Sequence, residues 1–267
     1  MSQNNETSDK GLLTFGGHLE VLRKLLIRII IVVVCVAVVV FSFKDVTFSI
    51  LLAPSEWNFI TYHWIEEFMH IFSSDFHFDK FHVDLIATDL SSQFMTHLTT
   101  AIYLGLLCAS PFIVYELYKF ASPALYENER KYSTKLVCIV YLLFILGVLM
   151  SYYVLFPISF RFLGTYSVAE KVHSTITLDS YISTFTTLTL MMGLVFQLPV
   201  IAYALAKMKL INAGIMKRYR HYAFLLIMLV SAIITPPDVM TMILVGMPLY
   251  LLYEISIKIV ERTNKES

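Results

Sequence analysis

Carboxylates and cations stand beside apolar side chains in two short segments, 18–23 and 120–130. A carboxylate in such a place can bind a guanidinium, because charge-assisted hydrogen bonds between the two groups can be bidentate. The alternative is that each carboxylate pairs with a nearby Arg or Lys of the same chain. The residues of interest are Glu20, Arg23, Phe120, Glu129 and Arg130.

A single amide side chain, Gln197, lies in an apolar run two residues before Pro199. A polar side chain at the depth of a bilayer is costly unless it finds a hydrogen-bond partner. Proline frees a backbone acceptor, since it has no N–H to donate. Gln197 therefore either bonds to the local backbone or contacts a polar group on another subunit's helix, and the sequence leaves both interpretations open.

Signatures of catalysis and of metal binding are missing from the sequence. There is no HExxH, GxSxG or P-loop motif, so we expect a protein that is not an enzyme and has no cofactor. His63, His70 and His77 recur every seven residues, which is a rise of roughly 10.5 Å on a helix. Neighbours that far apart cannot share an ion about 2 Å from each ligand, so no metal site is predicted.

The composition is that of a membrane protein. Hydrophobic residues make up 57% of the chain and charged residues 15%, against roughly 25% charged in soluble domains. The zero formal net charge gives no support for nucleic-acid binding. Apolar runs are continuous rather than alternating, which favours helices over a β-barrel. Ionisable pairs at mid-depth, as a small-solute transporter would use, are missing from these runs.

We therefore expect an all-α integral membrane protein with six transmembrane helices in one domain, 1–267. Intervals free of Asp, Glu, Lys and Arg place the spans, because a span needs about 20 mainly apolar residues. The expected spans are roughly 25–43, 92–117, 135–160, 180–206, 220–235 and 239–256.

The distribution of basic residues predicts the orientation. Lys and Arg concentrate in cytoplasmic loops. With the amino terminus in the cytoplasm, sixteen of the twenty basic residues lie inside and four outside, so both termini are expected in the cytoplasm. The four outer residues are Lys44, Lys80, Arg161 and Lys171.

Prolines inside the expected spans predict kinked helices that form a concave cup. They are Pro111, Pro157, Pro199 and Pro248. Pro236, Pro237 and Asp238 form a structural turn between the last two spans. Those spans of 15 to 17 apolar residues reach roughly 22–26 Å, less than the core of about 30 Å, so they either thin the bilayer or recruit flanking residues.

The segment 44–89 is the one large extramembrane element that we expect. It is rich in aromatic residues, among them Trp57 and Trp64. Aromatic side chains favour the membrane–water interface, so the segment is expected to form a cap on the outer surface.

Six ordered motifs that cover nearly the whole chain resemble those of the TatC family of the twin-arginine translocase. The motifs are 18–23 (similar to HLxELR), 86–89 with 110–111, 120–130 (with Pro-Ala-Leu-Tyr and Glu-Arg), 196–199 (similar to F-E/Q-x-P), 235–238 (TPPD) and 248–254 (PxYxxxE).

This resemblance implies a function and site residues. TatC proteins bind the twin-arginine signal peptides of folded cargo at the cytoplasmic face of the bacterial inner membrane. They assemble with single-span TatA and TatB subunits, as a homo-oligomer within the receptor complex, and transport draws on the proton-motive force. Glu129 and Phe120 match positions implicated in signal-peptide recognition, with Glu20, Arg23 and Arg130 on the same surface. Gln197 matches the intramembrane contact for a partner helix.

The chain departs from the family pattern at two places. Val21 stands where the family usually has Glu, and Glu20 lies one residue earlier, about 100° away on a helix. Either Glu20 reaches the ligand from another angle, or Glu129 carries more of the recognition. The outer segment 44–89 is also longer than the resemblance leads us to expect.

Overall fold

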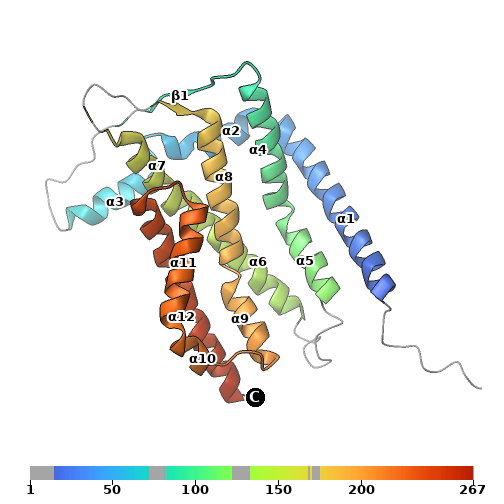
Figure 1. The fold of residues 1–267 in the computed structure, drawn as a ribbon. Helices are drawn as coiled ribbons and strands as arrows, with labels where there is room; N and C mark the ends of the chain where they lie inside the picture. Colours follow the sequence, from blue (N-terminus) through green and yellow to red (C-terminus); the bar gives the residue numbers. More distant parts are fainter. Residues whose placement is uncertain are drawn as a thin grey trace, which may run out of the picture.

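The computed structural model describes residues 15–71, 81, 83–121, 133–167, 169 and 175–266. Long helices run side by side across the molecule, with α1 at one edge and α11 and α12 at the other (Figure 1). The principal helices are α1 (Phe15–Ser42), α4 (Ser92–Cys108), α5 (Ser110–Ala121), α6 (Ser133–Met150), α7 (Phe156–Thr165), α8 (Leu178–Val195), α9 (Leu198–Lys207), α10 (Ala213–Arg218), α11 (Arg220–Ile234) and α12 (Val239–Glu266).

Four of the described helical stretches are long and apolar enough to cross a membrane, namely Leu19–Ser42, Val137–Thr165, Leu178–Lys207 and Val239–Lys265. The pair α4 and α5, bent by 54°, makes a fifth if it is one span. The remaining expected span, the fifth at 220–235, corresponds to α11, which is apolar but has 15 residues. The fold is thus all-helical with four or five candidate spans, and the count of six stays a prediction.

Three of the four prolines occupy the second residue of α5, α7 or α9; α5 and α9 follow a break in the helix, whereas α7 continues directly from a π-helical turn. Pro111 is in α5, Pro157 in α7 after a π-helical turn at 151–155, and Pro199 in α9. Proline is tolerated in the first helical turn because the missing N–H has no partner there. Pro248 differs, since it lies inside the continuous helix α12.

Helix α12 has 28 residues and runs ten residues beyond the expected end at residue 256. The charge-free interval ends at residue 253, before Glu254, and the expected span extends three residues beyond it. Glu and Lys are good helix formers, and the spacing of Glu254 to Lys258 and of Glu261 to Lys265 places opposite charges one turn apart. The helix therefore continues where the apolar run does not.

Small residues bring the helices close together. A Cβ on Gly105 of α4 would lie 2.8 Å from the Cβ of Ala37 in α1. A Cβ on Gly147 of α6 would lie 2.5 Å from the carbonyl oxygen of Met192 in α8. Lipid tails are as apolar as Leu, so membrane helices associate largely through such close packing.

The segment after α1 forms a cap of two helices, α2 (Lys44–Leu52) and α3 (Ile60–His70), joined through a 3₁₀ turn. Tyr62 is buried in it, and its hydroxyl lies 2.9 Å from the carbonyl oxygen of Pro54 and 3.0 Å from that of Pro157. Burial raises the pKa of Tyr62, so the hydroxyl stays a donor. The cap is thereby bonded to α7.

Two short strands lie beside the cap and add a small parallel pairing that the sequence did not predict. Leu85 in β1 (Leu85–Ile86) pairs with Ile176 in β2 (Ile176–Thr177).

The spacing of three histidines does not lead to a metal site among the described residues. His77 lies outside the described residues, and His63 bonds to Asn58 at 2.8 Å. Within the described ranges, no three His, Cys, Asp or Glu side chains are grouped as a metal site would require.

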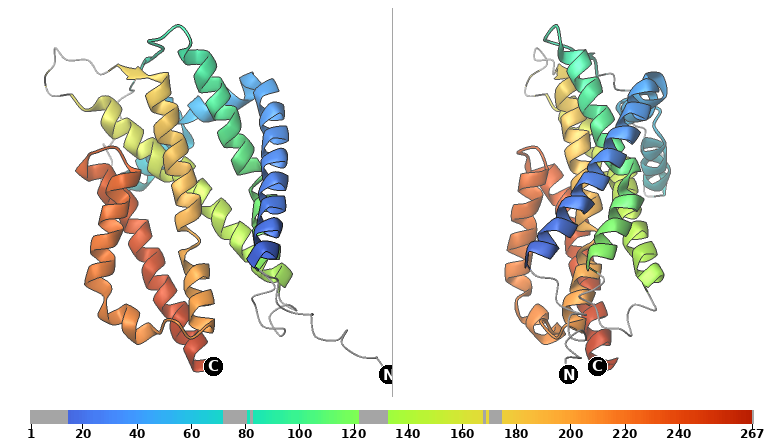
Figure 2. Two further views of the ribbon diagram at one scale, coloured as in Figure 1. Left: turned by 45° about the vertical axis from the view of Figure 1, so that its right-hand side comes forward. Right: turned by 90° about the vertical axis from the view of Figure 1, so that its right-hand side faces the viewer.

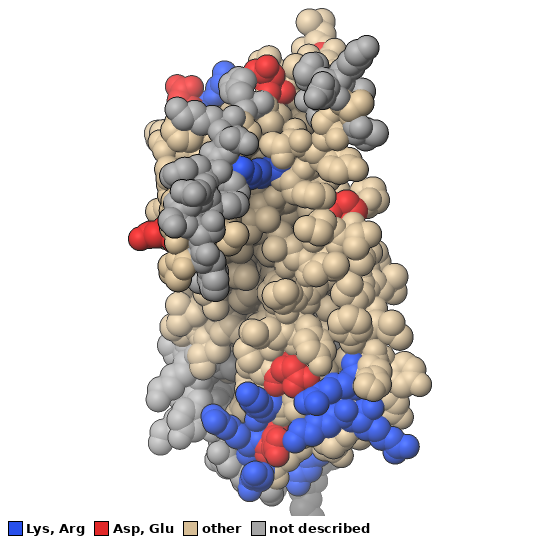
Figure 3. Space-filling model, turned by 90° about the vertical axis from the view of Figure 1, so that its left-hand side faces the viewer, with Lys and Arg blue, Asp and Glu red and all other residues tan. Residues whose placement is uncertain are grey.

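Basic side chains gather at one end of the molecule. The described chain begins and ends at this end, where α1 starts and α12 finishes (Figure 2). In Figure 3, Lys and Arg concentrate there, and a broad band without charge separates them from the opposite end. This is the arrangement that the unequal distribution of basic residues predicts, although the side of the membrane stays a prediction. The concave cup likewise stays a prediction.

Candidate functional site

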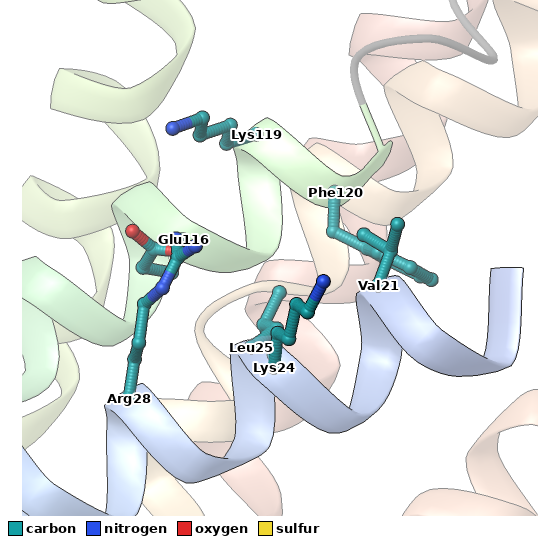
Figure 4. A pocket seen from close by; sticks show the side chains of 7 residues that line it. All are labelled: Val21, Lys24, Leu25, Arg28, Glu116, Lys119 and Phe120. Atoms are coloured by element: carbon teal, nitrogen blue, oxygen red, sulfur yellow. The ribbon is translucent and has the colours of Figure 1, made fainter. Parts of the chain in front are cut away.

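A pocket of about 220 Å³ opens between the first turns of α1 and the last turns of α5, at the basic end of the molecule. Four of its residues come from α1 and three from α5 (Figure 4). The lining residues are Val21, Lys24, Leu25, Arg28, Glu116, Lys119 and Phe120. Two of them, Phe120 and Val21, are positions that the sequence singled out.

An ion pair crosses this pocket from α1 to α5. The Nη1 atom of Arg28 lies 3.4 Å from Oε2 of Glu116. The Glu116 side chain is 9% exposed and that of Arg28 54% exposed. Charge-assisted bonds between these groups are usually 2.7–2.9 Å long, so the contact is loose. Glu116 does not stand out in the sequence, because it falls one residue after a charge-free interval; its position at the end of an apolar run is the available signal.

Glu20 pairs within its own helix. Its carboxylate lies 2.7 Å from Nζ of Lys24, one turn along α1, and both side chains are 58% exposed. This is the local pairing that the sequence left open as the alternative. Exposed pairs of this kind add little stability, so Glu20 can exchange its partner. Arg23 is exposed on the same helix.

The two remaining residues of the sequence-predicted recognition surface, Glu129 and Arg130, lie outside the described residues. Phe120 is half-buried in the last turn of α5 and precedes their segment. The structure thus brings Phe120 together with Glu116 and Arg28 in one pocket, while the position of Glu129 relative to it stays open.

Gln197 occupies the break between α8 and α9. Its own N–H donates to the carbonyl of Leu194, three residues back, instead of to that of Gly193. The side-chain Nε2 donates to the Gly193 oxygen instead, at 3.3 Å. It also donates to the Val140 oxygen in α6, at 3.2 Å. Its Oε1 is buried, and no donor from the described residues reaches it. Gln197 therefore satisfies local backbone and still holds an unused acceptor.

The predicted turn joins α11 to α12. The Asp238 carboxylate caps α12, because one oxygen accepts a hydrogen bond of 2.7 Å from the Thr241 N–H and the other accepts one from the Thr241 hydroxyl. The Asp238 N–H donates to the Pro236 carbonyl at 2.7 Å. At the other end of the turn, the Thr235 hydroxyl donates to the Ser231 carbonyl and closes α11.

Two ion pairs hold the last helices together at the basic end. Arg220 of α11 contacts Glu254 of α12 through two nitrogen–oxygen distances of 2.7 and 2.8 Å. Lys217 of α10 lies 2.7 Å from Glu261 of α12. A fork-like Arg–carboxylate pair fixes orientation as well as distance.

Comparisons with known proteins agree with this arrangement. The family model of the Sec-independent protein translocase protein (TatC) matches residues 17–248. The chain belongs to the TatC family. It is 34% identical to TatC of Blattabacterium sp. subsp. Periplaneta americana over 94% of this chain and 96% of that protein. It is 32% identical to TatC of Carboxydothermus hydrogenoformans, with coverages of 92% and 91%.

The fold is that of solved TatC proteins. A crystal structure of the twin arginine translocase receptor TatC matches with a TM-score of 0.73 and 29% identity, covering 92% of this chain and 99% of that one. A second structure of the receptor, in DDM, matches with a TM-score of 0.72. The chain is therefore a TatC subunit of the twin-arginine translocase, a membrane protein that functions in protein translocation and is not an enzyme.

Proposed function

We propose that this TatC-family chain binds the twin-arginine signal peptides of folded proteins at the cytoplasmic face of the bacterial inner membrane. The observation that carries the proposal is the match to the twin arginine translocase receptor over nearly the full length of both chains. The proposal includes six transmembrane helices, with α11 as the fifth, and both termini in the cytoplasm. The basic residues at the end where α1 begins and α12 finishes support this orientation (Figure 3).

In this proposal, acidic side chains at the basic end hold the two arginines of the signal peptide. Glu129 and Glu20 supply the carboxylates, and Phe120, Arg23 and Arg130 complete the surface. The exposure of Glu20 supports its part, because an incoming guanidinium can replace Lys24. A guanidinium bonds to a carboxylate through two N–H groups, whereas the ammonium of Lys24 acts as a point charge. The exposed apolar side chains of α1 offer the peptide's apolar stretch a neighbouring surface.

The second part of the proposal concerns partner subunits. Gln197 is the contact for the helix of a single-span TatA or TatB subunit, and the receptor complex contains several copies of this chain. The unused Oε1 of Gln197 supports this role, because a buried acceptor in lipid gains from a donor on another helix. With no nucleotide-binding motif in the sequence, the proton-motive force drives transport.

Site-specific cross-linking tests this function. The full chain, carrying a photoreactive residue in place of Tyr126, is reconstituted in membranes with a signal peptide that has either two arginines or two lysines. We expect cross-links with the arginine peptide and a strong loss with the lysine peptide. Equal cross-linking of the two peptides would contradict the proposal. Export of a folded twin-arginine reporter, in a strain lacking its own TatC, provides the independent readout.

A further inference from the structure

The pocket between α1 and α5 has more cations than carboxylates. Lys24, Arg28 and Lys119 line it, and Glu116 is the one acidic side chain among the lining residues. Lys119 is exposed and forms no ion pair with any residue that the structure describes. Lys24 is also paired with Glu20 of α1 at 2.7 Å, so three cations face two carboxylates and one positive charge is left in excess among the described residues.

The one carboxylate in the pocket does not neutralise this charge. Glu116 is 3.4 Å from a single nitrogen of Arg28, whose guanidinium has five N–H donors. More than half of the Arg28 side chain is exposed, so further donors are accessible to a ligand. In Figure 4 the Lys24 and Arg28 side chains rise from α1 toward α5. These donors suit a group with several acidic oxygens.

The pocket also lies beside an exposed apolar surface of α1. On α1, the turns next to it expose large apolar side chains, with Ile30 59% and Ile31 56% exposed. Val21, Leu25 and Phe120 supply apolar walls within the pocket itself. Cationic groups above an apolar helix surface match a phospholipid, whose anionic headgroup adjoins its acyl chains.

We propose that this pocket binds the phosphate headgroup of an anionic phospholipid. Arg28 contacts two phosphate oxygens, Lys24 and Lys119 act as point charges on either side, and the acyl chains lie along α1. The volume of about 220 Å³ is below the roughly 300–1,000 Å³ of pockets for drug-sized ligands, which fits a phosphodiester better than a folded peptide. The inference requires that α1 lies in a membrane and does not depend on signal-peptide binding.

Native mass spectrometry of the full chain tests this site, with phosphatidylglycerol titrated in neutral detergent and phosphatidylcholine as the uncharged comparison. The pocket variant is Lys24→Gln with Lys119→Gln. The matched control is Lys207→Gln with Lys258→Gln, which removes the same charge from exposed lysines at the same end of the molecule but outside the pocket. All four lysines are exposed, so both variants should fold; equal thermal unfolding midpoints in neutral detergent check this.

We expect wild type to retain one phosphatidylglycerol in preference to phosphatidylcholine. Each lysine removed from the pocket should raise the dissociation constant about fivefold, while the control variant keeps the wild-type value. Equal affinities of the pocket and control variants would overturn the proposal. Displacement by inorganic phosphate at the concentrations at which phosphatidylglycerol binds would also overturn it, because the site would then select a free anion.

Discussion

The side-chain amide nitrogen of Gln197 lies 3.2 Å from the carbonyl oxygen of Val140, so the break between α8 and α9 is bonded to α6. The same side chain keeps a buried Oε1 without a donor from the described residues. The Gln197 nitrogen thus bonds to backbone of its own chain, while its oxygen is available to a donor on another helix. The two interpretations that the sequence leaves open, a local bond and a contact with another subunit, are therefore compatible.

Replacing Gln197 by Leu should weaken association with a single-span partner while signal-peptide cross-linking is retained. Hydrogen bonds between membrane helices contribute about 0.6 kcal/mol on average and up to about 1.7 kcal/mol, so we expect reduced rather than abolished association. Co-purification with a tagged partner subunit measures this. Gln93→Leu, at an exposed position in the first turn of α4, is the matched control. Unchanged recovery of the partner would remove Gln197 from the interface.

Replacing Glu129 by Ala should abolish cross-linking to a twin-arginine peptide, and Glu129→Gln should reduce it less. Truncating one partner of a desolvated charge pair costs about 2–5 kcal/mol. Glu127→Ala, two residues earlier in the same segment, changes the same charge and serves as the control. Glu20→Ala should have the smaller effect, since Glu20 already has Lys24 as a partner. Normal peptide binding by the Glu129→Ala variant would exclude that residue.

Replacing Gly147 by Ala should destabilise the packing of α6 against α8. The new Cβ would lie 2.5 Å from the Met192 carbonyl oxygen, which is backbone and cannot turn away. Overpacking of this kind costs about 1–3 kcal/mol. Gly246→Ala is the comparison, because its Cβ would meet the flexible Met228 side chain at 3.1 Å. Thermal unfolding in detergent should rank the two variants in this order, and the reverse order would contradict the packing argument.

Replacing Asp238 by Ala should lower stability by about 1 kcal/mol, as the loss of a helix N-cap usually does. Asp238→Asn should retain most of the stability, because an amide oxygen also accepts a hydrogen bond from the Thr241 N–H. Unfolding midpoints of the two variants give the measurement. Should Ala and Asn be equally destabilising, the carboxylate would act through its charge and not as a cap.

Exchanging the charges of Arg220 and Glu254 tests whether their pair joins α11 to α12. Glu254→Arg alone should destabilise the chain, and adding Arg220→Glu should restore part of the loss. The side chains are 42% and 30% exposed, so the pair contributes at most about 1 kcal/mol. A double-mutant cycle on unfolding midpoints isolates this energy. Additive effects of the two substitutions would show that the pair makes no net contribution.

Much of the helical framework could be predicted from the sequence, because long intervals without charge mark helices in a membrane protein. The same criterion marks the apolar span 239–256 and not the end of α12, since Glu254 and Lys258 continue the helix beyond the apolar residues. It also passed over the π-helical turn at 151–155, whose position depends on packing between helices. The pairing of β1 with β2 joins residues that are distant in sequence, and nothing in either dipeptide indicates it.

The candidate site was predicted in part. Phe120 lines the pocket, and the capping role of Asp238 follows from its place at the start of a helix. The pairing of Glu116 could not be predicted, because its partner, Arg28, comes from a helix 88 residues away in the chain. On a helix, Glu20 can pair with a residue three or four positions later, which is Arg23 or Lys24. The structure pairs it with Lys24.

Pro111 stands at the joint between α4 and α5, where the helices are bent by 54°. Straightening this joint would place a residue without an N–H in a helix interior, at a cost of about 3 kcal/mol or more. We therefore expect α4 and α5 to keep their bend when neighbouring helices or subunits move against them.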